Sequence, residues 1–383
     1  MLINELPDDC LLTIFDCIQD LTDLVNCFKV CKKWCNLIVV RTKKVKYFID
    51  RPNNLPDSVC HLSDELIDVT FLCKWFPNLR IVDFCKCGDM SPAEAVELIR
   101  DSESLKGTIT SINVLFWIGS ADLSRLLMNA NLEMFSTELL FFDTSLIHEH
   151  VKQLHLPHPN TFLPKDAAHT FPNLERLNIC CVTESGDNYS NGPVMANLKI
   201  IELRLNSNDW EDPCRIFEVM DSCPALQSAH IINGNDNFKI DDSIKNANLQ
   251  DLVIQFYFST KWGKLPRCIS KYPNIKHLAL RNSHLSDEDI KRLILILPKL
   301  TLLDVRESSG VTQEAADHVR DYCKQYGRSI KFYFKKDDKQ IETDWPQSLN
   351  LPEKICRGFD FMEHCFFKSF DDLPHLLDPI DDS

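Results

Sequence analysis

The chain has 383 residues, of which 44% are hydrophobic, and a formal net charge of −14. This length suffices for a large buried core and more than one domain. The acidity argues against general binding to nucleic acid or to an anionic membrane, because both require a basic face. No apolar run is long enough for a membrane span, and acidic residues interrupt the first 20 positions, so we expect neither a span nor a signal peptide. The 17 scattered cysteines indicate reduced thiols and a cytoplasmic or nuclear location.

Residues 1–48 are predicted to form a small all-helical domain. Pro7 suits the start of a helix, and Asp8 and Asp9 suit its first turn, where the helix dipole favours anions. The apolar side chains that follow spread over about 160° of the helix, more than the ~100° stripe of an ordinary surface helix. Three short helices in this segment cannot bury all of their apolar residues among themselves. Either the next part of the chain covers the excess or another protein does.

Residues 6–38 resemble the F-box motif. The matching residues, in the order and spacing of that family, are Leu6, Pro7, Asp8, Leu12, Ile14, Phe15, Leu21, Asp23, Leu24, Val30, Cys31, Lys32, Trp34 and Leu37. Asp9 stands where the family often has Glu, which is a mild departure.

The F-box resemblance implies docking onto a Skp-type adaptor and, through it, onto a cullin–RING ubiquitin ligase. The residues that it places at or beside the adaptor interface are Leu6, Pro7, Ile14, Phe15, Leu24, Val30, Cys31 and Trp34. A surplus of apolar surface on short helices agrees with a protein interface. Packing of some of these residues against the following repeat is the alternative.

A repeated frame runs through residues 49–334: an apolar residue, two residues, an apolar residue, one residue and a third apolar residue. The first apolar positions recur every 19 to 30 residues, at Leu79, Ile109, Leu132, Val151, Leu174, Leu198, Leu226, Leu249, Ile275 and Leu300. This period is typical of leucine-rich repeats. The last two apolar positions lie on the same face of a short strand, and segments such as 286–297 and 91–100 have helical patterns between strands.

The repeats resemble the cysteine-containing subclass of leucine-rich repeats. We therefore expect an α/β solenoid, or horseshoe, of roughly ten to twelve stacked units, with a parallel sheet on the concave side and helices outside. An ordinary α/β domain also alternates strands and helices, but it does not repeat a fixed apolar frame.

The residue that follows each apolar pair is predicted to face the concave surface. Arg281 and Arg306 would then be neighbours, with Gln255 beside them and Arg204 two strands further. Arginine side chains in such a row suit a carboxylate-rich or phosphorylated protein target. Pairing with nearby carboxylates, as in an ordinary solvated face, is the alternative.

Catalytic and metal-binding signals are weak. The sequence has no phosphate-binding loop, nucleophile elbow or HExxH motif, so we expect no enzyme activity and no cofactor. His148, His150, His155 and His158 form a loose set, but His155 is expected on the exposed face of a strand, and a zinc site is improbable. The cysteines near Cys31 and Cys85 are expected to pack as small apolar residues.

Residues 335–383 are predicted to be an acidic tail that is partly capping and partly disordered. Residues 356–373 are rich in phenylalanine and could cover the last repeat or dock a partner, while 376–383 are expected to be disordered.

An F-box followed by leucine-rich repeats resembles the F-box/leucine-rich-repeat class of substrate receptors. This resemblance implies a non-catalytic substrate-recognition subunit of an SCF (Skp–cullin–F-box) E3 ubiquitin ligase. Two other roles stay open: an F-box/leucine-rich-repeat scaffold without a part in degradation, and a leucine-rich-repeat regulator of the enzyme-inhibiting or GTPase-activating type.

Overall fold

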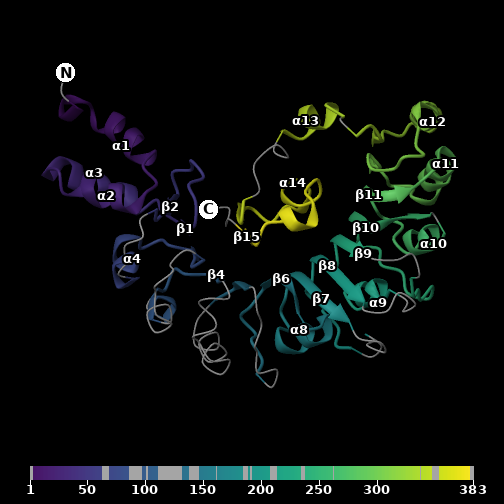
Figure 1. The fold of residues 1–383 in the computed structure, drawn as a ribbon, viewed down its shortest axis with the longest axis horizontal. Helices are drawn as coiled ribbons and strands as arrows, with labels where there is room; N and C mark the ends of the chain where they lie inside the picture. Colours follow the sequence, from purple (N-terminus) through teal and green to yellow (C-terminus); the bar gives the residue numbers. More distant parts are fainter. Residues whose placement is uncertain are drawn as a thin grey trace. The chain divides into compact units, whose positions relative to one another are not determined.

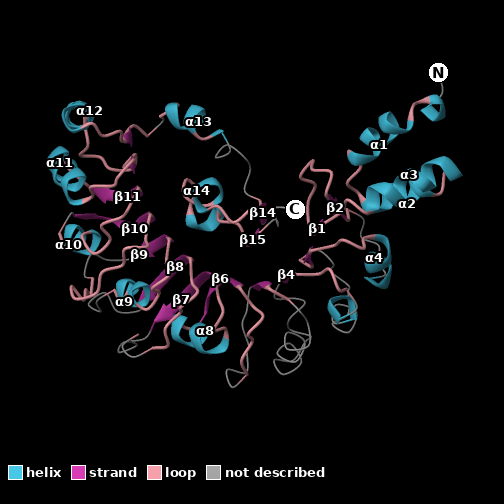
Figure 2. Cartoon of the chain, turned by 180° about the vertical axis from the view of Figure 1, so that it is seen from behind, coloured by secondary structure: helices cyan, strands magenta, loops and turns pink. Residues whose placement is uncertain are grey.

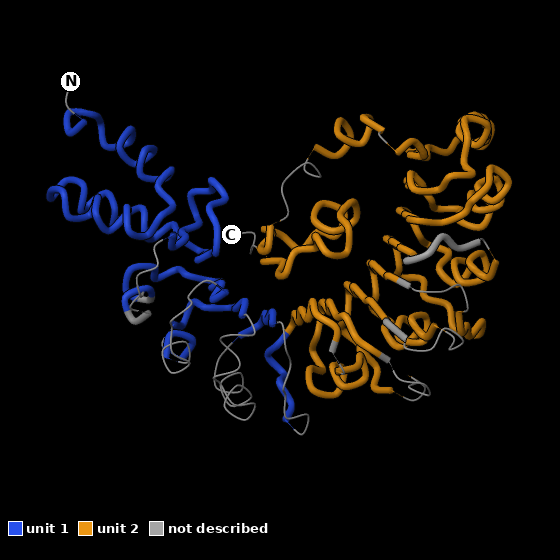
Figure 3. The backbone as a smooth tube through the Cα atoms, viewed as in Figure 1, with its two compact units in different colours: residues 1–151 blue, residues 152–383 orange. Residues whose placement is uncertain are grey.

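The fold is given by a computed structural model of the chain. The residues that it describes are 3–62, 69–85, 97–100, 102–110, 132–137, 146–160, 162–183, 189, 192–207, 214–233, 238–261, 263–336, 338–346 and 353–379. Backbone contacts divide the chain into two compact units, residues 1–151 and 152–383 (Figure 3). The boundaries predicted at 48/49 and 334/335 differ from this division and stay a prediction.

The first unit begins with helices and continues with short parallel strands. Its helices are η1 (Ile3–Glu5), α1 (Asp8–Asp16), α2 (Leu21–Phe28), α3 (Lys32–Thr42) and α4 (Val69–Trp75). Its strands are β1 (Tyr47–Ile49), β2 (Ser58–Cys60), β3 (Ile81–Asp83), β4 (Gly107–Thr110) and β5 (Met134–Thr137), paired in the order β2-β1-β3-β4-β5. The predicted helix at 91–100 begins outside the described residues.

The second unit contains eight strands of the parallel sheet among its described residues. They are β6 (Gln153–Asn160), β7 (Arg176–Thr183), β8 (Ile200–Ser207), β9 (Ser228–Asn233), β10 (Asp251–Lys261), β11 (His277–His284), β12 (Leu302–Asp304) and β13 (Lys331–Tyr333), and they pair in chain order. Parallel neighbours in chain order are the pattern of a solenoid.

Helices connect successive strands of the second unit and lie on one side of its sheet (Figures 1 and 2). They are α8 (Pro164–Thr170), α9 (Ile216–Asp221), α10 (Leu265–Ile269), α11 (Asp287–Ile296) and α12 (Gln313–Tyr326). The predicted helix at 286–297 is confirmed as α11. Its first turn is closed by a capping box, in which the Ser286 hydroxyl accepts from the Asp289 amide and the Asp289 carboxylate accepts from the Ser286 amide.

The repeat frame accounts for the core. Every predicted first position from Leu132 to Leu300, and Leu79 before them, is at most 2% exposed. The strand register aligns Leu177 with Ile201, Ala229, Leu252, Leu278 and Leu303, which are the second positions of successive frames. The predicted leucine-rich-repeat solenoid is confirmed by this register.

The predicted frame at Ile109 is wrong. Ile109 pairs with Asp83 and Ser136 in the middle of β4, so the equivalent of Leu132 in this unit is Leu105. The outward pair in β4 is Thr108 and Thr110, and these are buried. Because both are polar, an apolar frame could not detect the correct register.

A further segment, residues 353–379, follows the solenoid and is called the C-terminal segment below. It contains β14 (Ile355–Arg357), α14 (Phe361–His364), the short helix η3 (Phe370–Asp372) and β15 (Leu376–Asp378), and it is preceded by α13 (Gln340–Asp344). The expected disorder of 376–383 is wrong for Leu376–Asp378, which pairs with β14 and is fully buried.

Candidate functional site

Helices α1 to α3 leave several large apolar side chains in contact with solvent. Ile14 and Val30 are 40% and 56% exposed, and Val39 and Val40 of α3 are 42% and 45% exposed. Beneath them, α1 and α2 each pack against α3 and bury Leu11, Phe15, Leu24 and Ile38. The helices thus form a small core and still present apolar surface.

The N-terminal turn is fixed to α3 by polar contacts. The Trp34 indole donates to the Asn4 side chain at 2.7 Å, and its ring packs edge-on against Phe15 with centroids 5.1 Å apart. Lys33 donates to the Leu6 carbonyl at 2.9 Å and lies 3.1 Å from the Asp8 carboxylate. These contacts hold Leu6 and Pro7 beside α3.

Arg41 joins the helices to the first strands. Its guanidinium is fully buried and donates to the Phe15 carbonyl at 3.3 Å and to the Ser58 carbonyl at 3.1 Å. The Phe15 carbonyl belongs to the end of α1, where it also accepts from the Ile18 amide at 3.1 Å, and a cation is favoured at this end of a helix. Burial lowers the pKa of Arg41, while Asp16 and Asp57 oppose that change.

The second candidate site is the inner face of the second unit, defined as the face of β6–β13 opposite helices α8–α12. One row across the strands contains Asn178, Glu202, His230, Val253, Ala279 and Asp304. The next row contains Cys180, Arg204, Ile232, Gln255 and Arg281. This register agrees with the rows predicted from the repeat frame.

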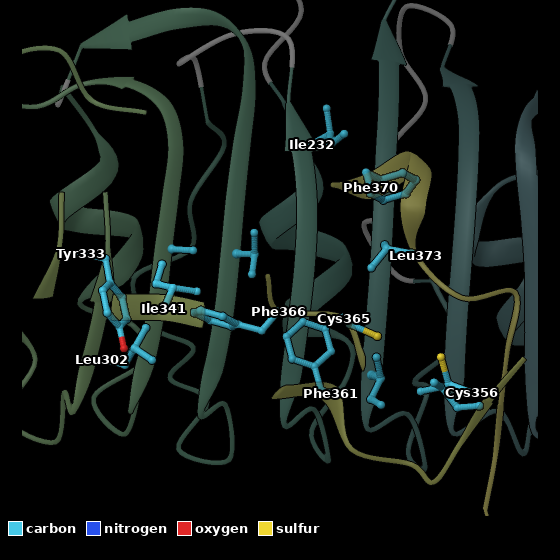
Figure 4. Close-up of a cluster of buried hydrophobic side chains, with 14 residues drawn as sticks. Ile232, Leu302, Tyr333, Ile341, Cys356, Phe361, Cys365, Phe366, Phe370 and Leu373 are labelled. Atoms are coloured by element: carbon cyan, nitrogen blue, oxygen red, sulfur yellow. The ribbon is translucent and has the colours of Figure 1, made fainter. Parts of the chain in front are cut away.

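The C-terminal segment lies on this face. Its apolar side chains join those of the strands in one buried cluster (Figure 4), made of Ile200, Ile232, Val253, Ala279, Leu302, Tyr333, Ile341, Cys356, Phe361, Cys365, Phe366, Phe370, Leu373 and Leu377. The phenylalanine-rich residues were expected either to cover the last repeat or to dock a partner. They also cover strands well before the last repeat, and docking of a partner stays a prediction. Each strand from β8 to β12 contributes one apolar residue to this cluster, and these residues lie in three different rows of the register.

Arg176 is the most deeply buried charged contact of the segment. Its guanidinium donates to the Glu202 carboxylate at 2.7 Å, to the Pro374 carbonyl at 2.6 Å and to the His375 carbonyl at 3.1 Å. Arg176 and Glu202 are 1% and 0% exposed in their side chains. A buried ion pair needs additional hydrogen bonds to offset the loss of water, and here the C-terminal segment provides two of them.

Arg204 makes an ion pair and a ring contact with the same segment. Its guanidinium donates to the Asp371 carboxylate at 2.6 Å and lies 4.6 Å from the centre of the Phe370 ring. The Phe370 ring also packs edge-on against the His230 ring, with centroids 5.7 Å apart. Phe370 thus contacts two different strands of the inner face.

Two buried histidines lie under the segment. The His155 ring stacks on His375 with centroids 4.3 Å apart. Burial, with His375, Arg176 and His158, holds the pKa of His155 well below its usual value, and burial with Arg281 and Arg204 does the same for the pKa of His230. Both are neutral at neutral pH. The expectation that His155 lies on an exposed strand face is wrong, because the C-terminal segment covers it.

Residues 3–41 match the F-box-like family model. This range contains the whole of α1 and α2 and nearly all of α3, and the strands that follow carry the leucine-rich-repeat register described above. The chain therefore carries an F-box-like motif followed by leucine-rich repeats.

Several solved structures resemble this chain at low identity. The leucine-rich repeat-containing protein LegL7 from Legionella pneumophila is 16% identical, with 62% of this chain and 78% of that chain covered and a TM-score of 0.37. The APL1 leucine-rich repeat domain is 10% identical (76% and 80% covered, TM-score 0.35), and the structure of the yeast Rad7 and Elc1 complex contains a chain that is 13% identical (68% and 82% covered, TM-score 0.30). No curated protein matches the sequence.

The predicted adaptor residues divide into two groups in the F-box. Pro7, Ile14 and Val30 are exposed, and Leu6, Cys31 and Trp34 are half-buried. Phe15 and Leu24 are buried in the core of the helices and can only support the surface from behind. Val39 and Val40 were not predicted; their exposure depends on how α3 is packed, which periodicity alone did not reveal.

The predicted target residues of the solenoid are largely engaged by the protein itself. Arg204 pairs with Asp371, and Arg281, which is 7% exposed, donates to the main-chain carbonyls of Phe366 and Lys368. Arg306 makes two contacts of 2.9 Å with Asp304, as the alternative of local pairing expects. The Gln255 side-chain oxygen is buried and has no hydrogen-bond partner among the described residues. Binding of a separate target by these residues stays a prediction.

Metal and membrane sites receive no support from the described ranges. They hold no group of three or more His, Cys, Asp or Glu side chains arranged to bind a metal ion. No helix within these ranges has the length and apolar character that crossing a membrane requires. The described cysteines form no disulfide.

Proposed function

We propose that this F-box/leucine-rich-repeat protein is the non-catalytic substrate-recognition subunit of an SCF E3 ubiquitin ligase. The observation that carries the proposal is the exposed apolar surface of an F-box-like helical motif, above all Ile14 and Val30. Apolar side chains concentrated on a small motif favour a protein interface over free solvent exposure. In this proposal the partner is a Skp-type adaptor that links the protein to a cullin–RING ligase.

The solenoid would hold a protein target near the ubiquitin carrier of the ligase. Such a subunit contributes effective concentration and needs no catalytic residues of its own. The proposal places the protein in the cytoplasm or the nucleus, where reduced cysteines are expected. Arg204, Gln255, Arg281 and Arg306 are the target residues in this proposal, and they suit an acidic or phosphorylated partner.

The first experiment tests adaptor binding. We expect Ile14→Asp with Val30→Asp to weaken capture of a co-expressed Skp-type adaptor at least 100-fold, because each change buries a charge in an apolar contact. Val194→Asp is the matched control, since Val194 is an exposed valine of the second unit (64% exposed). Equal adaptor capture by the double variant and the control would refute the F-box interface.

The second experiment separates a ligase subunit from a scaffold. The intact protein is expressed with the adaptor, cullin and RING subunits, and ubiquitin transfer to proteins that co-purify with it is measured. We expect transfer that the Ile14→Asp/Val30→Asp variant abolishes. Adaptor binding without any transfer would favour the scaffold role.

A further inference from the structure

The inner face of the solenoid is built to hold a polypeptide segment. Its central strands carry apolar side chains where a solvated sheet face has polar ones, namely Ile200, Ile232, Val253, Ala279 and Leu302, and each is at most 3% exposed beneath the C-terminal segment (Figure 4). Uncovered, these residues would expose one apolar side chain on each of five neighbouring strands, and exposed apolar area of this kind is typical of a binding surface.

Several contacts between the face and the segment involve only the backbone of the segment. Arg281 donates to two carbonyls, and Arg176 donates to two more. The Gln153 side chain donates to the Leu377 carbonyl at 2.5 Å and accepts from the Leu377 amide at 3.1 Å. Since every peptide has these groups, such contacts do not depend on the sequence of the bound segment.

Other contacts select side chains. Phe366 is fully buried, and Phe370, four residues later, lies between Arg204 and His230. Asp371 follows directly and makes the ion pair with Arg204. The side-chain pattern read by the face is therefore two phenylalanines four residues apart, followed by a carboxylate.

The segment is attached to the solenoid without joining its sheet. Among the described strands, β14 and β15 pair only with each other. Release of the segment therefore breaks no hydrogen bond between strands of the solenoid. On release, the contacts between the inner face and the C-terminal segment are replaced by contacts between the inner face and another ligand.

We propose that the C-terminal segment is a ligand in cis for the target-binding face, and that a target binds by displacing it. This inference rests on the proposed function and specifies the target: an acidic segment with a Phe-x-x-x-Phe-Asp pattern. A tethered competitor acts at an effective concentration of about millimolar for a short connection, so targets with one weak copy of the pattern are rejected.

The test uses the full chain and a fluorescent synthetic peptide of residues 353–379. We expect full-length Phe366→Ala/Phe370→Ala protein to bind this peptide at least 10-fold more tightly than wild-type protein, because its own segment competes less. Glu363→Ala is the control: Glu363 is an exposed residue of the same segment, and it should leave peptide binding at the wild-type level. Equal peptide binding by all three proteins overturns the proposal.

A second variant tests the proposal without changing the phenylalanines, in case the first variant does not fold. A site-specific protease site is inserted within 347–352 of the full chain, and the folded protein is cleaved after purification. We expect the labelled peptide to replace the cleaved segment, and a peptide with Phe366→Ala, Phe370→Ala and Asp371→Lys to compete at least 10-fold less well. A cleaved segment that never exchanges shows a permanent part of the fold and overturns the proposal.

The two proposals fail separately. Peptide exchange needs no adaptor, so normal adaptor capture without exchange overturns only the inference about the segment. Normal exchange without adaptor capture overturns only the ligase assignment.

Discussion

At the scale of single residues, Arg176 shows how distant parts of the chain cooperate. It occupies a strand position before the apolar pair, where sequence periodicity predicts only a residue of the inner face. The two carbonyls that it binds lie 198 and 199 residues later in the chain. No local pattern could indicate these partners, because they depend on the path of the C-terminal segment.

The buried pair gives a prediction for stability. We expect Arg176→Met to lower the free energy of unfolding by about 3–5 kcal/mol, because it leaves the Glu202 carboxylate buried without its cation. Adding Glu202→Leu should recover a large part of that loss. Chemical denaturation of both single variants and the double variant measures the coupling.

The half-exposed pair of Lys199 and Glu175, 2.6 Å apart, is the matched control. Lys199→Met should change the free energy of unfolding by about 0–1 kcal/mol, as expected of a solvated pair. A similar loss for Arg176→Met and Lys199→Met contradicts the role given to burial.

The neutral histidines predict a pH dependence. The pKa values of His155 and His230 are depressed in the folded state, so the unfolded chain takes up protons first as the pH falls. The contribution of the two histidines to the free energy of unfolding is therefore fully present above the ordinary histidine pKa of about 6.5. Below that pH it decreases, by at most about 1.4 kcal/mol per pH unit for each histidine. Arg281 and Arg204 lower the pKa of His230 in the same direction as burial does.

Comparison of wild-type protein with His230→Leu isolates this contribution. Between pH 6.5 and pH 5.5, the free energy of unfolding should decrease less for the variant than for the wild-type protein. The carboxylates are the same in both proteins, so their contribution cancels in this comparison. Parallel pH profiles of the two proteins would exclude His230 as the cause.

At the scale of the elements, the repeat frame is informative because each strand buries two alternating side chains against its helices. That requirement is local, so Leu174, Leu226 and Leu300 could be placed from sequence. It fails at β4, where Thr108 and Thr110 take the buried positions. Threonine has nearly the same size as valine and can fill such a buried position. A search for apolar residues does not recognise it, and the frame is then placed at the next apolar residue, Ile109.

These two threonines give a paired prediction. The Thr110 hydroxyl donates to the Ser136 carbonyl at 3.3 Å, whereas the Thr108 hydroxyl is buried and lacks a partner within the described part of the chain. We expect Thr108→Val to raise the free energy of unfolding by about 1 kcal/mol, since it removes an unsatisfied hydroxyl, and Thr110→Val to lower it by a similar amount. Urea denaturation checks both signs, and a loss in both variants contradicts the assigned hydrogen bonding.

At the scale of the whole molecule, the sequence predicts the F-box and the solenoid well because both depend on repeated or closely spaced residues. Ile14 and Val30, which were predicted at the adaptor interface, are exposed, whereas Phe15 and Leu24, predicted there too, are core residues of the helices. The sequence predicted which residues line the inner face, but it did not predict that the C-terminal segment covers them. This covering depends on residues 353–379 returning across strands that precede them by up to about 220 positions.

The pairing of β15 with β14, described above, changes what the loss of a few residues means. Deletion of the five residues 374–378 is a small change in length. Here it would delete β15, take both carbonyl acceptors from Arg176 and uncover the ring of His155. Loss of residues 374–378 therefore belongs with damaging changes to the core and is not a neutral variant.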